Sequence, residues 1–529
     1  MTEKSWQKAA PSAREFDAIV IGSGMGGMTS AAILAKLGQK VLVLEQHYTP
    51  GGFTHAFKRP GYEWDVGVHA VGEVTLHSAL GRLLAHLTDS RLKWASLGPV
   101  YDEFYFPDGF RIDFPDSPQQ FRANLIEAFP DEVEAIDGYL GEIRKVTKAM
   151  RGYYLSKALP RWLKGVADLT LASEAQTQLE RLTCDVVNDL TDDPKLRALM
   201  VAQWGYYGSP PSRSSFAIQA LVVKHFSHGG FYPVGGSKRI AVEMLRTVAD
   251  AGGYTQIRAD VDEILVRNGK ATGVRLKDGT EYTSKKVISA AGVQSTMNHL
   301  LPAEYAEKDW AKDVRALNPA PAHVCLYLGF KGDITEAGAT AANKWFYRTW
   351  DCEQTEWIVA PGEEIPEAPC LYCSFPSLKD PEHNPGPEVR HTGEVVTFVP
   401  FEVFEKWRDT RWMKRGDDYE AFKKEIADEL LKQFLKEMPE LEPMLDHVEL
   451  STPLSTDHFV RPSKGSIYGI EPTPERFRTS ELSARSKIKN LYFSGSEVAS
   501  VGVMGAMVGG MLAAVAAEPV KAMKMIKGL

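Results

Sequence analysis

A glycine pattern near the N-terminus constrains the fold more than any other feature of the sequence. Gly22, Gly24 and Gly27 form Gly-x-Gly-x-x-Gly directly after the apolar run 16–21. The first glycine lets the chain turn sharply out of a strand, the second lets the backbone approach a pyrophosphate, and the third lets the next helix pack closely. The N-terminus of that helix offers free N–H groups to phosphate oxygens. The pattern therefore predicts a dinucleotide-binding turn between a buried strand and a helix.

The residues around this turn complete a strand–helix–strand unit. Residues 16–21 and 40–45 are short apolar runs typical of buried parallel strands. Residues 28–37 are rich in Ala and Leu, as expected of a helix, and Gly38 ends the stretch. Glu45 follows the glycines by about 20 residues, where a carboxylate can accept hydrogen bonds from ribose hydroxyls. The unit predicts an α/β fold with a Rossmann-like domain.

A second glycine-rich segment, near the C-terminus, distinguishes between the two cofactors that share this fingerprint, NAD and FAD. Residues 491–494 have the pattern of a short strand, and Gly495, Glu497 and Gly505 follow it. A turn and a helix N-terminus at this place can approach a flavin ring or its diphosphate, so the pair of segments favours FAD. The apolar stretch 498–517 approaches the length of a membrane span. A span would leave the glycine turn without a role, so we expect a buried helix instead.

The middle of the chain separates the two cofactor segments. Residues 76–225 are largely helical in pattern, 238–251 predicts a helix, and Asn268-Gly269 predicts a hairpin. Residues 301–455 alternate strand patterns with loops rich in Pro and Gly. Because both ends of the chain resemble pieces of one cofactor domain, we expect the substrate region to be inserted between them. The expected division is an FAD-binding domain of the glutathione reductase type from 14–75, 230–300 and 456–520, and an α+β substrate-binding domain from 76–229 and 301–455.

Composition argues against several classes of function. The chain has 529 residues, and a net charge of −8 without a Lys/Arg-rich tract argues against nucleic-acid binding. The N-terminus lacks the apolar core of a secretory signal, and the cysteine count of five is odd, so a cytoplasmic location is expected. Cys370 and Cys373 are spaced as in a zinc site but lie in an apolar strand pattern without two further ligands. We therefore expect no metal.

Together, these stretches resemble the phytoene desaturase superfamily of FAD-dependent oxidoreductases, most closely its retinol saturase and carotenoid cis-trans isomerase branch. The resemblance runs from about residue 16 to residue 517. The dinucleotide motif is widely shared, whereas Asp65-Val66-Gly67-Val68-His69 and Tyr232-Pro233-Val234-Gly235-Gly236-Ser237 are more particular to this branch. The other stretches that carry the resemblance are 17–27, 44–45 with Gly51 and Gly52, and 494–497 with Gly502 and Gly505.

The resemblance implies a non-covalent FAD and a long apolar substrate: a polyene, retinoid, carotenoid or acyl chain. Family members saturate, desaturate or isomerise such chains, and the resemblance does not fix which reaction applies. By position it assigns the ADP half to Gly22, Gly24, Gly26, Gly27, Glu45 and Gln46, and the diphosphate to Gly51 and Gly52. It assigns the adenine to the backbone of Val261, and the ribityl chain and ring to Gly495, Glu497, Gly505 and Ala506.

Three side chains are candidates for proton transfer. His69 follows the second strand and the Gly51–Gly52 pair, and an imidazole can titrate near neutral pH. Tyr232 is a candidate for the wall of the substrate cavity, and His458 lies in a loop that the family brings close to the flavin. A histidine that only shapes its turn, and a tyrosine that only packs, are equally consistent with the sequence.

The leading hypothesis is an oxidoreductase that saturates or desaturates a carbon–carbon bond. The alternatives are a redox-neutral cis-trans isomerase that uses reduced FAD, a flavin amine oxidase, and a lipid-binding protein that keeps FAD only as structure. No second Gly-x-Gly-x-x-Gly on a strand–turn–helix is evident, so the electron donor or acceptor stays unnamed. Residues 153–171 and 521–529 mix apolar or aromatic side chains with basic ones, so peripheral membrane contact is also expected.

Overall fold

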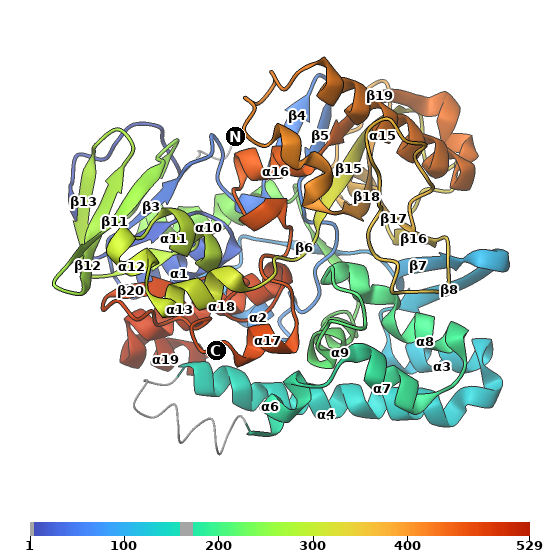
Figure 1. The fold of residues 1–529 in the computed structure, drawn as a ribbon, viewed down its shortest axis with the longest axis horizontal. Helices are drawn as coiled ribbons and strands as arrows, with labels where there is room; N and C mark the ends of the chain where they lie inside the picture. The colour runs from blue at the N-terminus through green and yellow to red at the C-terminus, as the bar shows by residue number, and fades with distance from the viewer. Residues whose placement is uncertain (1–4, 159–172) are drawn as a thin grey trace.

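A parallel sheet forms part of the left-hand half of the molecule in Figure 1 and carries the glycine pattern. The computed structural model describes residues 5–158 and 173–529. The five strands of the sheet are ordered β10-β3-β2-β14-β20, and every neighbouring pair is parallel. β2 (Ala18–Ile21) and β3 (Val41–Glu45) are fully buried, which is why both appear as continuous apolar runs in the sequence. The other strands are β10 (Tyr254–Ile257), β14 (Val287–Ser289) and β20 (Leu491–Phe493).

The two faces of this sheet are covered by different layers. Ala18 and Val20 pack with apolar side chains of three helices, whereas Ile19 and Ile21 face the opposite side and pack with a second, four-stranded sheet. Successive side chains of a strand point to opposite faces, so both faces of a central strand must be apolar. The three helices are α1 (Met25–Lys36), α10 (Lys238–Asp250) and α18 (Gly502–Ala517).

The four-stranded sheet contains the predicted hairpin. β11 (Val261–Arg267) and β12 (Lys270–Leu276) pair antiparallel through Asn268-Gly269, and both turn residues have positive φ, as a tight hairpin requires. β13 (Glu281–Ser284) and β1 (Glu15–Phe16) complete the order β1-β13-β12-β11. The stretch 256–266 divides between two sheets instead of forming one strand. The chain changes direction between β10 and β11, at Arg258, where φ is +56°.

A seven-stranded sheet forms the core of the other half of the molecule. Its order is β19-β15-β18-β17-β16-β7-β8. Alternate residues of its strands face two separate hydrophobic cores: Tyr327, Trp345 and Tyr372 lie in one, and Leu326, Phe346 and Leu371 lie in the other. The strands are β7 (Val100–Phe106), β8 (Phe110–Pro115), β15 (Ala322–Lys331), β16 (Asn343–Tyr347), β17 (Cys370–Ser374), β18 (Arg390–Val399) and β19 (Leu445–Ser451).

The expectation that residues 76–225 are largely helical is wrong for 94–115. This stretch forms β6 (Trp94–Ser96), β7 and β8. Buried aromatic residues at Phe104, Phe106 and Phe114 follow the period of two that a strand requires, and they pack in the core of the larger sheet. Elsewhere in the range the helical prediction is confirmed by α2 (Ala79–Leu87), α3 (Pro118–Ala128), α4 (Val133–Ala158), α6 (Ser173–Leu179), α7 (Thr183–Leu190), α8 (Pro194–Val201) and α9 (Phe216–His225).

The remaining elements connect these layers. The seven-stranded sheet also contacts the helix α15 (Asp417–Glu437). The short hairpins and helices are β4 (Ala56–Arg59), β5 (Tyr62–Asp65), β9 (Phe231–Pro233), α11 (Val293–His299), α12 (Ala303–Ala306), α13 (Asp309–Ala316), α14 (Pro376–Lys379), α16 (Pro453–Phe459), α17 (Pro474–Arg478) and α19 (Pro519–Lys527). The division of the chain into two discontinuous domains stays a prediction.

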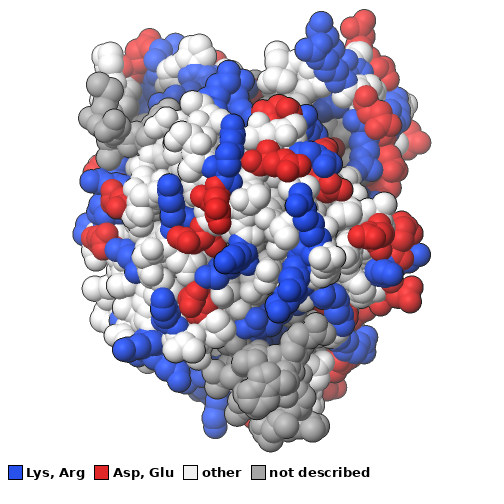
Figure 2. All heavy atoms as spheres, turned by 90° about the vertical axis from the view of Figure 1, so that its left-hand side faces the viewer, with Lys and Arg blue, Asp and Glu red and all other residues white. Residues whose placement is uncertain are grey.

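The apolar stretch near the C-terminus is a buried helix, as predicted. α18 packs against α1 and begins directly after the glycine turn. A side chain at Gly510 would collide with the backbone of Gly26, so the two helices are held at close range. Within residues 5–158 and 173–529, no helix is both long and apolar enough to cross a membrane. Figure 2 shows acidic and basic side chains interspersed over the left-hand side of the molecule.

Candidate active site

The N-terminus of α1 forms a cradle suited to phosphate groups. Gly24 caps the helix without a side-chain hydrogen bond, and the first turn holds no acidic residue. A Cβ added to Gly24 would meet no protein atom within 4 Å, whereas a Cβ on Gly26 would lie 2.6 Å from the backbone of Gly495. Gly22 has a φ of +90°, which permits the sharp exit from β2. The helix therefore presents its positive end to open space, as anion binding requires.

Glu45 lies beside this cradle at the end of β3. Its carboxylate accepts hydrogen bonds from the backbone N–H of Ser23 at 2.9 Å, the hydroxyl of Ser23 at 2.5 Å, and the N–H of His47 at 2.8 Å. The hydroxyl of Ser23 also accepts a hydrogen bond from the N–H of Gly51 at 3.0 Å. Ser23 thus joins Glu45 to the Gly51–Gly52 turn, in which Gly52 approaches Gly24 closely. The sequence did not single out Ser23, although it occupies a variable position of the glycine pattern.

The C-terminal segment forms the second half of the cradle. Gly495 follows β20 with a φ of +109°, and no protein atom lies within 4 Å of the position its Cβ would take. Val501 caps α18 without a side-chain bond, and the first turn of α18 has no acidic residue. Glu497 is buried and accepts hydrogen bonds from the N–H groups of Val293 at 2.5 Å and Gln294 at 3.2 Å. Burial raises the pKa of Glu497.

The other predicted cofactor residues lie around the same two helix ends. Gln46 donates a hydrogen bond to the backbone oxygen of Phe459 at 3.4 Å. Val261 is the first residue of β11, and Ala259 just before it donates its N–H to the backbone oxygen of Glu45. Gly505 and Ala506 lie in the first turns of α18 and are partly exposed.

His69 lies close to the cofactor segment because its loop packs on the Gly51–Gly52 turn. The N–H of Val66 donates to the backbone oxygen of His55, and Gly67 packs so tightly on Phe53 that its Cβ would lie 3.1 Å from the Phe53 oxygen. His69 itself contacts the seven-stranded sheet, where its ring meets Tyr372 edge-on with centroids 5.0 Å apart. The histidine therefore sits at the junction between the cofactor segment and that sheet.

A buried carboxyl group lies directly behind the ring of His69. His69 Nδ1 is 2.9 Å from Glu394 Oε2, and the side chain of Glu394 is 0% exposed. Neither atom has a partner with hydrogen-bond geometry among the described residues. Burial, followed by the charge of Lys379, lowers the pKa of His69 to about 3, whereas burial raises the pKa of Glu394 to about 8. Burial therefore favours the neutral forms of both groups, an imidazole next to a carboxyl group, over an ion pair.

Lys379 completes this cluster from α14. Its ammonium donates hydrogen bonds to the backbone oxygen of His69 at 2.8 Å, to Asn343 Oδ1 at 2.5 Å and to Ser374 Oγ at 2.7 Å. Asn343 in turn donates to the buried Asp102 at 2.9 Å. Burial lowers the pKa of Lys379 to about 7. A buried lysine and a buried glutamate with pKa values near neutrality are typical of functional sites.

Tyr232 and His458, the other two catalytic candidates, have different surroundings. The hydroxyl of Tyr232 is buried and donates to Asp65, which also accepts hydrogen bonds from Ser237. This contact ties β9 to β5, so the position of Tyr232 fits a residue that holds Asp65 in place. His458 lies in the helix α16 and not in the loop that the sequence predicted, and it stacks on Trp412 of a surface loop with ring centroids 5.1 Å apart. The structure does not bring His458 into contact with the residues around His69.

His323 is a titratable residue that the sequence analysis missed. It is buried on β15, and its Nδ1 has no hydrogen-bond partner among the described residues. Burial, together with the charge of His69, lowers its pKa to about 4. The chain just before it, at Ala320, donates a hydrogen bond to Gly469, whose Cβ would lie 2.8 Å from Glu497. His323 therefore lies between the His69 cluster and the C-terminal cofactor segment.

Comparison with known proteins identifies the family. Residues 25–517 match the family described as flavin containing amine oxidoreductase. The chain belongs to this family. All-trans-retinol 13,14-reductase of Danio rerio is 32% identical over 518 residues, which cover 94% of this chain and 85% of the relative. Prolycopene isomerase of Daucus carota is 28% identical over 516 residues, which cover 93% of this chain and 79% of that protein.

The family confirms that this flavoenzyme is an oxidoreductase with FAD as its cofactor. Its fold is shared with solved structures of low sequence identity. Cyclohexylamine oxidase from Brevibacterium oxydans superposes with a TM-score of 0.61 at 15% identity, over 96% of this chain and 99% of that one. The cradle described above fits FAD, because two uncapped helix N-termini and two open glycines converge where the sequence predicts the diphosphate and ribityl chain.

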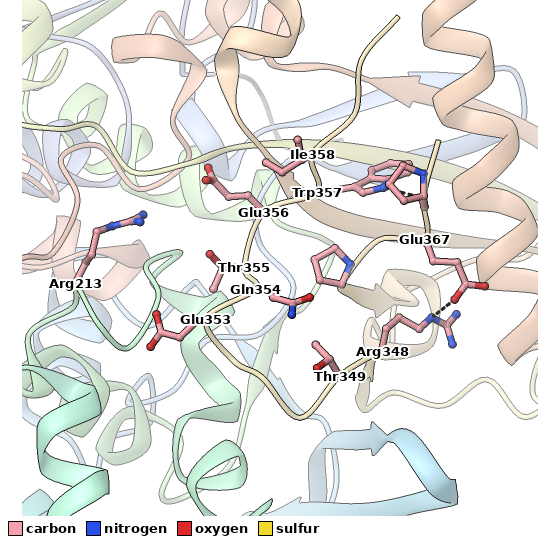
Figure 3. Close-up of a pocket in the computed structure, with 12 residues that line it drawn as sticks. Arg213, Arg348, Thr349, Glu353, Gln354, Thr355, Glu356, Trp357, Ile358 and Glu367 are labelled. Atoms are coloured by element: carbon pink, nitrogen blue, oxygen red, sulfur yellow. Dashed lines mark hydrogen bonds and ion pairs between the residues drawn. The ribbon is translucent and has the colours of Figure 1, made fainter. Parts of the chain in front are cut away.

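A surface pocket of this flavoenzyme lies away from the His69 cluster. It has a volume of about 520 Å³, and Figure 3 shows Arg213, Glu353, Glu356 and Arg348 around it. Arg213 and Arg348 already form ion pairs with Glu471 and Glu437. The pocket is lined by both polar and apolar side chains and shares no residue with the FAD cradle. No group of residues suited to a metal ion is present in the described part of the chain.

Proposed function

We propose that the chain is an FAD-dependent oxidoreductase that saturates or desaturates a carbon–carbon bond of a long apolar polyene such as a retinoid or carotenoid. The observation that carries the proposal is the His69–Glu394 pair, a protonated carboxyl group and an imidazole buried beside the cofactor segments. The similarity to all-trans-retinol 13,14-reductase supports the substrate class and the direction of saturation.

The proposed proton donor is His69. Reduced FAD, when bound, would supply the hydride for one carbon of the double bond, so the protein would have to deliver a proton to the other carbon. With its proton on Nε2, His69 donates that proton to the substrate while Nδ1 receives the proton of the Glu394 carboxyl group. The Glu394 carboxylate that remains is stabilised by the nearby ammonium of Lys379. The pair thus acts as donor and reservoir, and the imidazole returns to its neutral form.

The surroundings of Glu394 support an apolar substrate. Glu394 lies on β18, opposite Tyr327 of β15 and Ser374 of β17. The same face of the sheet carries Tyr372 and Phe398 in a hydrophobic core. Burial in such a core keeps both groups neutral and excludes water from the proton path. A small charged substrate would find few partners on this face, whereas a polyene would contact apolar and aromatic groups.

Product mass tests the reaction. The FAD-loaded protein is reduced chemically under anaerobic conditions and mixed with all-trans-retinol or a carotenoid. Saturation yields a product heavier by two hydrogens together with reoxidised flavin. A protein whose reduced flavin is not reoxidised by a polyene, and whose oxidised flavin is not reduced by one, contradicts the proposal. Reduction of the oxidised flavin by amines would favour the amine oxidase alternative.

Cis-trans isomerisation is the second candidate because prolycopene isomerases match nearly the same length of this chain. An isomerase returns a product of unchanged mass, and the flavin stays reduced over many turnovers. It needs no proton from His69, so replacement of His69 by Ala would leave isomerisation largely intact. The analysis of products separates both enzymes from a lipid-binding protein, which would bind the polyene without changing its mass or its geometry.

Peripheral membrane contact is part of the proposal, because a polyene of this kind dissolves in lipid. Of the two stretches that the sequence favours, 153–171 extends into residues 159–172, which lie outside the described residues. The other forms α19 and the C-terminus, with Lys521, Lys524 and Lys527 among apolar side chains. The electron donor or acceptor is not part of the proposal.

A further inference from the structure

The tip of one surface loop carries two apolar residues that are flanked by two basic residues. Arg411, Trp412, Met413 and Lys414 form its tip, and a backbone bridge between Arg411 and Lys414 closes the turn. Trp412 is 39% exposed and Met413 is 74% exposed. Most large apolar residues of the chain are buried, so an exposed Trp–Met pair at the end of a loop marks an interaction surface.

The loop is built to hold these side chains outward. Arg415, the next residue, is buried and donates hydrogen bonds to the backbone oxygens of Trp407, Thr410 and Leu454. These bonds fix both the base of the loop and its contact with α16. Met413 has a φ of +60°, the left-handed conformation that non-glycine residues adopt only in a defined turn. Exposure of the tip is therefore a property of a fixed turn.

An aromatic base joins the tip to the cofactor cradle. Trp412 stacks on His458 at 5.1 Å with an interplanar angle of 7°, and it meets Phe459 edge-on at 5.2 Å. Phe459 also meets Tyr48, which is 48% exposed, with centroids 6.3 Å apart. The backbone oxygen of Phe459 accepts the hydrogen bond from Gln46 at the end of β3. One continuous surface thus runs from the tip to the edge of the proposed ADP site.

The charge of the tip is not neutralised by the protein. Neither Arg411 nor Lys414 forms an ion pair with any residue in the described part of the chain, whereas the neighbouring Arg461 and Lys464 pair with Asp260 and Glu402. Two free cations on either side of Trp and Met match the interface of a bilayer, where indole rings sit among headgroups and basic side chains meet anionic lipids.

We propose that this tip, together with Tyr48, docks the enzyme on a lipid bilayer that contains anionic headgroups. The proposal rests on the proposed function in that its apolar substrate resides in lipid. A bilayer fits better than an acidic protein, because the exposed apolar groups form a projecting turn that can enter the headgroup layer. α19 offers a different surface: it lies in the lower part of Figure 1, whereas α16 lies in the upper part.

Vesicle flotation tests the docking surface with the FAD-loaded protein. Vesicles of phosphatidylcholine alone are compared with vesicles that also contain phosphatidylserine. The double variant Trp412→Ser/Met413→Ser is expected to bind both at least about tenfold more weakly, from the apolar area withdrawn. The double variant Arg411→Gln/Lys414→Gln is expected to lose about fivefold for each removed charge, only on vesicles with phosphatidylserine. Unchanged FAD content in both variants shows that the fold is kept.

A matched control is Val520→Ser, which removes an apolar side chain that is 80% exposed on α19. It is expected to float like the wild type, and loss of binding in this variant instead would overturn the proposal in favour of α19. Absence of wild-type flotation, or wild-type flotation of the tip variants, would also overturn it, the former in favour of a protein partner. If the wild type floats through the tip but transforms no polyene, the proposed reaction fails while the docking surface stands.

Discussion

Replacing Glu394 by Gln tests whether this residue is a buried carboxyl group that keeps its proton at neutral pH. Its pKa rises from 4.5 to about 8, with burial as the largest cause. A group whose folded-state pKa is raised contributes stability that is fully present below pH 4.5 and is lost as the pH rises through 8. At 1.36 kcal/mol per pH unit, the loss amounts to roughly 5 kcal/mol across that interval. Gln keeps the size of the side chain and cannot ionise, so the variant lacks this loss.

Thermal unfolding of both proteins between about pH 5 and pH 9 measures the effect. The unfolding temperature of the wild type should fall relative to that of Glu394→Gln as the pH rises, by several degrees over the interval. Lys379 changes in the opposite sense: its pKa is lowered from 10.5 to about 7, so its contribution is lost as the pH falls through 7. Because the charge of Glu394 raises the pKa of Lys379, its contribution does not cancel, and the measured difference reports the coupled pair. Glu382→Gln, the same substitution at an exposed position, is the control.

The result that refutes this reasoning is a constant difference between wild type and variant from pH 5 to pH 9. Glu394 would then be ionised in the folded protein over this range, as it is in the unfolded chain, and the neutral pair with His69 would not exist. Glu394 could then not serve as the proton reservoir, and the proton for the substrate would have to come from elsewhere, with His323 the next residue to test.

Three further changes test the site. Glu45→Gln should weaken FAD binding by about 10- to 100-fold, because charge-assisted hydrogen bonds are lost; equilibrium dialysis measures this, and an unchanged affinity would place the ribose elsewhere. His69→Ala should lower the rate of polyene reduction by about 10²–10⁴-fold at full FAD content, and a loss that follows FAD content would make His69 structural. Gly24→Ala should abolish FAD retention and leave the unfolding temperature of the apoprotein unchanged, because its Cβ meets no protein atom within 4 Å. Equal FAD content in Gly24→Ala and wild type would show that the cofactor does not lie over the N-terminus of α1.

The strand, glycine-turn and helix geometry of the proposed cofactor site could be predicted from the sequence because its signals are local. The strand, the glycine turn and the helix of the N-terminal unit lie within residues 16–37, so spacing alone indicates their arrangement. The same holds for β20 and α18, where a strand pattern runs directly into glycines. β7 and β8 escaped prediction because Phe104 and Phe114 were assigned to a surrounding helical pattern, although a period of two was present.

The residues around His69 could not be predicted in the same way. Lys379 and Glu394 lie more than 300 residues after His69, and only the pairing of β18 with β15 and β17 brings Glu394 to the face that His69 meets. A signal was nevertheless present: Glu394 is the one acidic or basic side chain in residues 392–399, among apolar and small residues. A charged residue at an inward position of a buried strand is rarely tolerated without a partner, so it indicates either a buried pair or a site.

A link between the two halves of the molecule fixes the position of His69, the proposed proton donor. The N–H of Asp65, at the end of β5, donates a hydrogen bond to Glu394 at 3.1 Å, so the hairpin that follows the Gly51–Gly52 turn is fixed to the seven-stranded sheet. The carboxylate of Asp65 is held in turn by Tyr232 and Ser237, from the segment that leads into α10. His69 is four residues beyond Asp65. The hydrogen bond from Asp65 to Glu394 therefore fixes His69 relative to both the Gly51–Gly52 turn and the seven-stranded sheet. A substitution that removes the hydrogen bonds of Asp65 should displace His69, the proposed proton donor, relative to the flavin, even though Asp65 itself transfers no proton.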